Sequence, residues 1–411
     1  MHINKNIILL LLAQGISGAV VSLLTFSSTL AGKYLADGYF SLDGIECQKC
    51  ASKSLMGLFN LSTLPVSMSL CGAFIAIFFS SSAIERLGRK SAFLLSCVIG
   101  ILGAILGIFA LLNKSFWFFC LATFLLGFFT ALNGFYRFLA SEAIKTSNEN
   151  ATHKATALIV GGGVLGGILG PNLAHLGLNL SQTLFVGSFV FALLLCVLNL
   201  FLTLPLKLLP PEPKIKAYTA QPTKDKNFII ATLSCACGFA FMTLMMNSAP
   251  LAMSANAFDL KEAKDVLVWH FIAMYAPSLF FAFLLKNIKP LNLVLVGMGL
   301  YALAGFTALL WRDFWGFLFS LVLVGIAWAF SFNAGTFLLN SINSANKIKL
   351  QGLNTLFTFG ANFIASISVG ALLANGGWIL INIILLILVF CFFVVFILLF
   401  KKIQKRLNSR I

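Results

Sequence analysis

Segments of about 20 consecutive apolar residues recur along the whole chain, and each is long enough to cross a bilayer as a helix. We count twelve of them. Backbone groups inside hydrocarbon must find their hydrogen bonds within the chain, so this pattern predicts an all-α polytopic membrane protein. The predicted spans are Ile7–Leu30, Leu61–Ser80, Ser91–Leu112, Phe116–Phe138, Ala155–Leu178, Thr183–Pro205, Phe228–Pro250, Val266–Leu285, Leu291–Trp311, Phe314–Leu339, Leu353–Asn375 and Trp378–Phe400.

Composition excludes the main soluble classes. Hydrophobic residues make up 60% of the chain and charged residues 10%, with a mean hydropathy of +0.98. In a soluble domain, about half of the residues are hydrophobic and about a quarter are charged. The spans contain no convergent set of acid, base and nucleophile, so we expect neither an enzyme nor a prosthetic group. The chain also lacks the G-x-x-x-x-G-K-[ST] loop of nucleotide hydrolysis.

A polar segment with four prolines and five lysines, residues 206–227, interrupts the apolar pattern. It is too short to be a domain. We therefore predict two pseudo-symmetric six-helix bundles, residues 1–205 and 228–411, joined by a cytoplasmic linker. Two bundles that rock around a site near the midplane are the architecture of secondary transporters that work by alternating access.

The formal net charge of +16 is distributed unevenly along the chain. With the N-terminus inside, 21 of the 28 basic residues fall on the inner side, where the net charge is +16, and the outer side sums to zero. This is the positive-inside pattern of membrane proteins. We expect a bacterial inner-membrane protein with both termini in the cytoplasm and the lipid bilayer as its partner. The charge therefore indicates topology, and no nucleic-acid partner is expected.

The loop between the second and third spans reads Ser81-Ser-Ala-Ile-Glu-Arg-Leu-Gly-Arg-Lys90. It resembles the cytoplasmic signature of the major facilitator superfamily, roughly G-x-x-x-D-R-x-G-R-K. The matching residues are Arg86, Gly88, Arg89 and Lys90. Glu85 stands in place of the Asp, and Ser81 in place of the first Gly. The resemblance implies the major facilitator fold and a gating role for this motif, in which the acidic side chain meets helix termini and basic partners of the neighbouring helix.

Sulfur and imidazole side chains recur at helical spacing in the seventh and eighth spans. Met242 and Met246 form one pair, and His270 and Met274 form another. Residues four apart share a helix face, and both pairs lie about 6 and 12 Å below the outer helix ends. If the two faces turn toward each other, three thioethers and one imidazole make a site suited to Cu(I). The alternative is packing, because methionine commonly fills gaps between helices.

These two motifs in a twelve-span chain resemble the CcoA-type copper importers of the same superfamily. The resemblance implies that Met242, Met246, His270 and Met274 bind copper as the transported substrate. It also implies import for cbb3-type cytochrome c oxidase biogenesis and delivery to a cytoplasmic copper acceptor. Related carriers are linked to riboflavin uptake, so an organic-solute carrier for a compound such as riboflavin, or a drug exporter, is the alternative. No Asp or Glu lies at the centre of a span, which disfavours proton-driven drug export.

Other residues are secondary candidates. Cys235 shares a face with Met242 and is either an inner relay ligand or a packing residue, and Met245 and Met253 flank the cluster. Cys47-Gln-Lys-Cys50 lies in an outer loop and is either a disulfide or a copper-capture pair. Four amides within or near the spans are candidates to line a cavity: Asn133, Asn172, Asn247 and Asn362. The 43 phenylalanines are spread evenly, as lipid-facing helices require.

Overall fold

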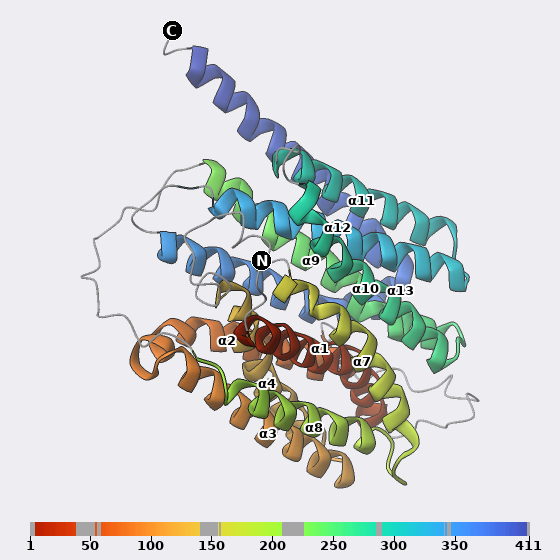
Figure 1. The fold of residues 1–411 in the computed structure, drawn as a ribbon. Coiled ribbons are helices and arrows are strands. Elements are labelled where there is room, and N and C mark those ends of the chain that lie inside the picture. The colour runs from red at the N-terminus through yellow and green to blue at the C-terminus, as the bar shows by residue number, and fades with distance from the viewer. Residues whose placement is uncertain are drawn as a thin grey trace.

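The computed structural model describes residues 5–37, 54–55, 59–139, 155, 158–207, 226–284, 290–340, 342 and 347–408. Nearly all of this part of the chain is helical (Figure 1). Its α-helices are α1 (Lys5–Asp37), α2 (Leu64–Leu87), α3 (Arg89–Leu112), α4 (Phe116–Asn133), α7 (Gly163–Leu176), α8 (Val186–Thr203), α9 (Lys226–Ala255), α10 (Leu260–Leu284), α11 (Pro290–Leu310), α12 (Phe314–Asn340) and α13 (Lys347–Asn408). Short elements are β1 (Ser54–Leu55), which pairs antiparallel with β2 (Phe59–Asn60), and the 3₁₀ turns η1 (Leu61–Thr63), η2 (Gly134–Leu139) and η3 (Gly177–Asn179).

The all-helical membrane fold is confirmed, and each predicted span overlaps a helix. Among the described residues, eight helices are long and apolar enough to cross a membrane, and the apolar helices Leu64–Ser80 and Phe116–Leu132 are shorter. The 62-residue helix α13 contains non-helical backbone at Gly377, with φ 58° and ψ −153°. Glycine adopts this conformation without steric cost, and it separates our eleventh span from our twelfth. The total of twelve spans stays a prediction.

The helices pack as two groups. The first group, α1 to α8, is held by contacts of α1 with α7, of α4 with α2 and α3, and of α3 with α8. The second group, α9 to α13, is held by contacts of α9 with α13 and α12, and of α12 with α10 and α11. The groups meet mainly where α7 packs on α10 and α2 packs on α13. Figure 1 shows the first group below and the second group above. Residues 208–225 of the predicted linker lie outside the described residues.

Side-chain size decides which face of a helix is buried when the whole helix is apolar. On α3, Gly100, Gly103 and Gly107 are buried, and large side chains such as Leu102 and Phe109 are at least half exposed. A Cβ at Gly103 would come within 3.0 Å of Leu126 N on α4. Small residues thus let membrane helices approach closely, and the large side chains face the lipid.

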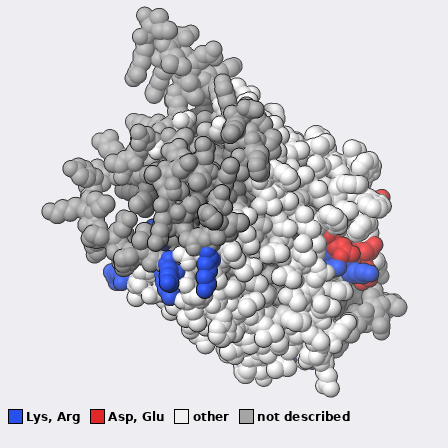
Figure 2. All heavy atoms as spheres, in the orientation of Figure 1, with Lys and Arg blue, Asp and Glu red and all other residues white. Residues whose placement is uncertain are grey.

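Charged and aromatic side chains mark the two ends of the molecule. Figure 2 shows only basic side chains at one end, and the acidic side chains together with basic ones at the other. The acidic residues with described side chains are Asp259, Glu262, Asp265 and Asp313, all in segments predicted to lie outside. Trp117, Trp311 and Trp315, which are 57–65% exposed, flank the ends of α4, α11 and α12 that are predicted to lie outside. Tryptophan concentrates at both membrane interfaces, so these side chains mark where the helices reach the membrane surface.

Candidate functional site

A cavity of about 180 Å³ lies between the two groups of helices. Its walls come mainly from α1, α2 and α4 of the first group and from α9, α10, α12 and α13 of the second. A single water needs roughly 10–15 Å³ of such volume, so the cavity has room for on the order of ten waters. The space is therefore much larger than one metal ion requires, and it suits an organic solute.

The described part of the cavity wall is polar or apolar but carries no charge: none of its side chains belongs to Asp, Glu, Lys, Arg or His. An unpaired charge is costly to transfer from water into such surroundings.

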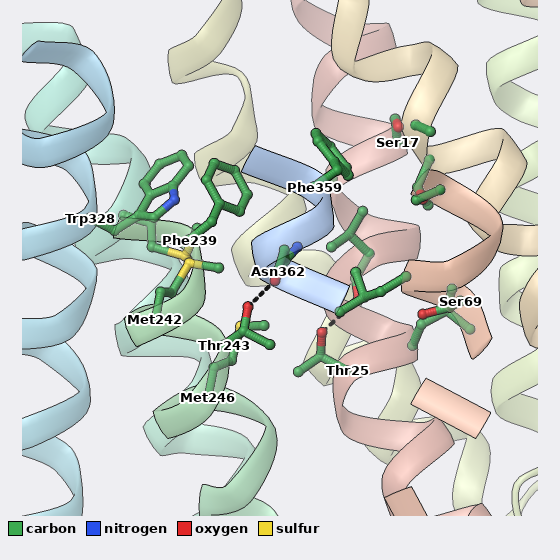
Figure 3. A pocket seen from close by; sticks show the side chains of 18 of the residues that line it. Ser17, Thr25, Ser69, Phe239, Met242, Thr243, Met246, Trp328, Phe359 and Asn362 are labelled. Carbon is green, nitrogen blue, oxygen red and sulfur yellow. Dashed lines mark hydrogen bonds between the residues drawn. The ribbon is translucent and has the colours of Figure 1, made fainter. Parts of the chain in front are cut away.

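Aromatic side chains from the second group cover one wall (Figure 3). Trp328 and Phe332 on α12 are stacked, with ring centroids 4.9 Å apart. Phe239 on α9 meets both of them edge to face, at 5.3 and 5.1 Å. Tyr275 on α10 and Phe359 on α13 extend the cluster, at 5.7 Å from Trp328 and 5.9 Å from Phe239. These five residues are named here the aromatic wall; all five line the cavity and pack against one another.

Hydroxyl and amide groups from the first group lie across the cavity from the aromatic wall. They belong to Gln14, Ser17 and Thr25 on α1, Ser69 on α2 and Thr130 on α4. We name these five residues the polar wall. Figure 3 shows Ser17, Thr25 and Ser69 on the side opposite Phe239 and Trp328. A solute that fills the cavity therefore touches both groups of helices.

Two of the four predicted cavity amides line the cavity. Asn362 on α13 accepts a hydrogen bond from the Thr243 hydroxyl, and Asn247 on α9 donates to Ser366 Oγ at 3.1 Å. Asn172 instead accepts a bond from Lys264 Nζ at 3.2 Å, where α7 meets α10. The Asn133 side chain lies outside the described part of the chain.

The structure brings three of the four predicted copper ligands to the cavity. Met242, Met246 and Met274 line it. His270 does not: it is fully buried, and its Nδ1 lies 2.7 Å from the Leu321 carbonyl oxygen on α12. Its Nε2 is buried without a hydrogen-bond partner in the described structure. Phe271, Met274 and Tyr275 form the cavity face of α10, and His270 lies beside that face, toward α12.

The three secondary metal candidates that the structure describes are not on the cavity wall. Cys235 is fully buried, and its Sγ lies 3.8 Å from the Phe332 carbonyl oxygen. Met245 and Met253 are also fully buried in the core of the second group. Cys47 and Cys50 lie outside the described residues. Among the residues that are described, no group of three or more His, Cys, Asp or Glu is arranged to hold a metal ion.

The gating motif forms the turn between α2 and α3. Helix α2 ends at Leu87 and α3 begins at Arg89, and Gly88 between them has a φ of 79°. Only glycine adopts this backbone conformation readily, which explains the Gly at this position. Arg86 is exposed, whereas Arg89 and Lys90 are partly buried. The side chain of Glu85 is outside the described part of the chain, so its contact with helix termini and basic partners of the neighbouring helix stays a prediction.

The aromatic wall is the part of the site that the sequence did not reveal. Its five members come from four helices and are far apart in sequence. Among 43 phenylalanines, no local spacing distinguishes the cavity residues from those that face lipid. The one available signal was tryptophan in a span: Trp328 is in the middle of α12, away from the interface that tryptophan usually occupies.

Comparisons with known proteins agree with this architecture. A family model described as "Sugar (and other) transporter" matches residues 15–204. Riboflavin transporter RfnT of Brucella anthropi is 29% identical over 397 residues, which cover 92% of each chain. The uncharacterized MFS-type transporter YddS of Bacillus subtilis is 24% identical over 362 residues, covering 81% of this chain and 79% of that one.

A solved structure shows the same fold. The human organic anion transporter MFSD10 (TETRAN) matches with a TM-score of 0.64 at 15% identity, over 94% of this chain and 97% of that chain. Together with the helical architecture and the signature turn at Gly88, these similarities indicate a multi-pass membrane transporter rather than an enzyme, and the chain is similar in sequence and in fold to members of the major facilitator superfamily.

Proposed function

We propose that this protein carries riboflavin, or a similar flat and uncharged heteroaromatic solute, across the bacterial inner membrane. The observation that carries the proposal is the uncharged cavity between the helix groups with an aromatic wall on one side. The similarity to a riboflavin transporter over 92% of the chain supports the same solute. This was the alternative that the sequence offered beside copper.

The mechanism we propose is alternating access by two six-helix bundles, with both termini inside and twelve spans in total. A planar ring stacks on Trp328 and Phe239, which contributes about 1–3 kcal/mol per ring by analogy with base stacking. Contacts between the bundles on the outer side of the cavity, such as Ser67 with Ser366, close the path to the outside. Import requires these contacts to open and those on the inner side to form.

Growth rescue of a riboflavin-auxotrophic bacterium tests this function. We expect the wild-type protein to restore growth at low external riboflavin, and Trp328→Leu to need a higher concentration. Trp315→Leu is the matched control, because Trp315 is 57% exposed at the membrane interface. If the wild-type protein is present in the membrane and gives no rescue, riboflavin import is wrong.

Copper is the second candidate, because three thioethers line the same cavity. Soft uncharged ligands suit Cu(I), and such an importer supplies cbb3-type oxidase through a cytoplasmic copper acceptor. Cellular copper and oxidase activity in a deletion strain test it. A copper carrier predicts that both fall on deletion, that the wild-type gene restores them, and that a gene with Met242→Leu, Met246→Leu and Met274→Leu does not. Met→Leu nearly conserves volume. Our proposal predicts no copper phenotype.

A further inference from the structure

Three hydroxyl groups of the polar wall already donate hydrogen bonds within their own helices. Thr25, Ser69 and Thr130 each donate to a backbone carbonyl of their own helix, at 3.0, 2.7 and 2.9 Å. A hydroxyl has one proton to donate and two lone pairs that accept. On three different helices, therefore, a hydroxyl that keeps its bond to the helix is left with lone pairs and acts toward a solute as an acceptor.

Two further groups on α1 complete this wall. Gln14 and Ser17 are three residues apart and line the cavity. Within the described structure neither side chain has a hydrogen-bond partner, although Ser17 is only 3% exposed. Both can accept as well as donate. The polar wall as a whole thus has more acceptors than donors, and it is complementary to a solute segment that carries several O–H or N–H groups.

The opposite wall has a different character. It presents the rings of Phe239, Trp328 and Phe359 (Figure 3). The Thr243 hydroxyl is occupied by Asn362 Oδ1, which leaves the Asn362 amide nitrogen as a donor. Flat faces and a donor suit the ring system of a heteroaromatic solute, whose ring carbonyls and nitrogens accept hydrogen bonds.

We propose that the cavity binds its solute in one orientation, with a heteroaromatic ring on the aromatic wall and a polyhydroxyl chain on the polar wall. Thr25, Ser69 and Thr130 then select for the chain rather than for the ring. This inference rests on the proposed function, since riboflavin consists of such a ring and such a chain. It also explains how one small solute engages both groups of helices.

The expected discrimination follows from hydrogen bonding in a dry site. A site built to bond a solute hydroxyl rejects an analogue that lacks it, because its polar groups are then left unpaired. Lumiflavin has the riboflavin ring with a methyl group in place of the hydroxylated chain. We expect lumiflavin to bind wild-type protein about tenfold or more weakly than riboflavin.

Binding of the two flavins to purified protein, followed by flavin fluorescence, tests the orientation. The variant Thr25→Val with Ser69→Ala removes two acceptors at nearly constant shape. We expect this double variant to weaken riboflavin binding about tenfold and lumiflavin binding less than about twofold. Trp328→Leu should weaken the binding of both flavins by the same factor. Thr307→Val is the matched control, because Thr307 also donates to its own helix, at 2.8 Å, but lies on α11 away from the cavity.

The outcomes separate this inference from the proposed function. Retained lumiflavin binding shows that the double variant is folded. If wild-type protein binds the two flavins equally, or if the double variant weakens both alike, the orientation is wrong while flavin binding stands. If wild-type protein binds neither flavin, the proposed function fails and the orientation fails with it.

Discussion

The hydroxyl oxygens of Ser67 on α2 and Ser366 on α13 lie 3.0 Å apart and join the two groups of helices, on the side of the cavity that the charge pattern predicts to be outer. Asn247 on α9 donates to the same Ser366 hydroxyl at 3.1 Å and also lines the cavity. This contact between the groups is therefore linked through one residue to the cavity wall. Solute binding and opening of the two groups are coupled through this residue in the mechanism we propose.

Cysteines at these two positions should lock the transporter. The Oγ atoms of Ser67 and Ser366 are 3.0 Å apart, so thiols at the same positions lie within reach of each other. We expect oxidation of the double variant Ser67→Cys with Ser366→Cys to stop riboflavin uptake, and reduction to restore it. Each single variant, in the same background of native cysteines, serves as control. Normal uptake by the cross-linked protein would mean that the outer contact need not open.

The glycines of α7 should be sensitive to a single added methyl group. A Cβ at Gly167 would lie 2.5 Å from the Phe271 side chain, where α7 meets α10. Overpacking of this kind costs about 1–3 kcal/mol. We expect Gly167→Ala to lower the unfolding temperature of the purified protein. Gly299→Ala on α11 is the control, since it has open space within 4 Å and alanine favours a helix. Equal unfolding temperatures for the two variants would contradict the close α7–α10 packing.

His270 should act in stability rather than in binding. It is fully buried and contacts the Leu321 carbonyl of α12, so His270→Ala leaves a cavity and removes one hydrogen bond between α10 and α12. We expect a loss of about 2–4 kcal/mol in the free energy of unfolding, with the riboflavin Kd nearly unchanged in the protein that remains folded. A variant of wild-type stability that no longer binds solute would instead place His270 in the binding site.

Removal of copper should not affect flavin transport. The cavity is much larger than one ion requires, and its aromatic wall is complete without a metal. We expect riboflavin uptake by vesicles to be the same with and without a Cu(I) chelator, and Met242→Leu to change it by less than about twofold. Loss of flavin uptake on chelation, recovered by added copper, would show that the thioethers carry a functional ion.

Reporter fusions test the orientation in the membrane. Alkaline phosphatase is active only outside the cytoplasm, so we expect activity when it follows Asn113, between α3 and α4, and none when it follows the C-terminus. A fluorescent protein at the C-terminus should give the opposite result. If both reporters show the reverse pattern, the charge-based topology is wrong.

Hydropathy and charge were enough to predict the helical architecture, because a membrane leaves the backbone few alternatives. Spacing and depth predicted that the pairs Met242/Met246 and His270/Met274 lie at matching depths and can meet if their helix faces turn toward each other, since a helix fixes both quantities. The rotation of α10 about its own axis is fixed by neighbours such as Leu321 and Gly325 on α12. The spacing on α10 carries no such information, so it paired His270 with Met274 on one helix face, whereas only Met274 lines the cavity and His270 is buried beside it.

The aromatic wall was missed for a related reason. Phe239, Trp328 and Phe359 face the cavity because three helices converge there, and this convergence is a property of tertiary packing. In a chain where both lipid-facing and cavity-facing positions are apolar, a phenylalanine is equally favourable at either place. The chemistry of the cavity therefore became visible only with the helices assembled, and it changed the favoured solute from copper to an aromatic compound.

Exchange of riboflavin in liposomes that contain only the purified protein tests the central claim most directly. Vesicles are loaded with unlabelled riboflavin, and radiolabelled riboflavin is added outside. A carrier with the proposed cavity predicts transient accumulation of label above its equilibrium level, reduced by Trp328→Leu and unchanged by Trp315→Leu. Label uptake that equals that of protein-free liposomes, from protein shown to be folded, would contradict riboflavin transport by this cavity.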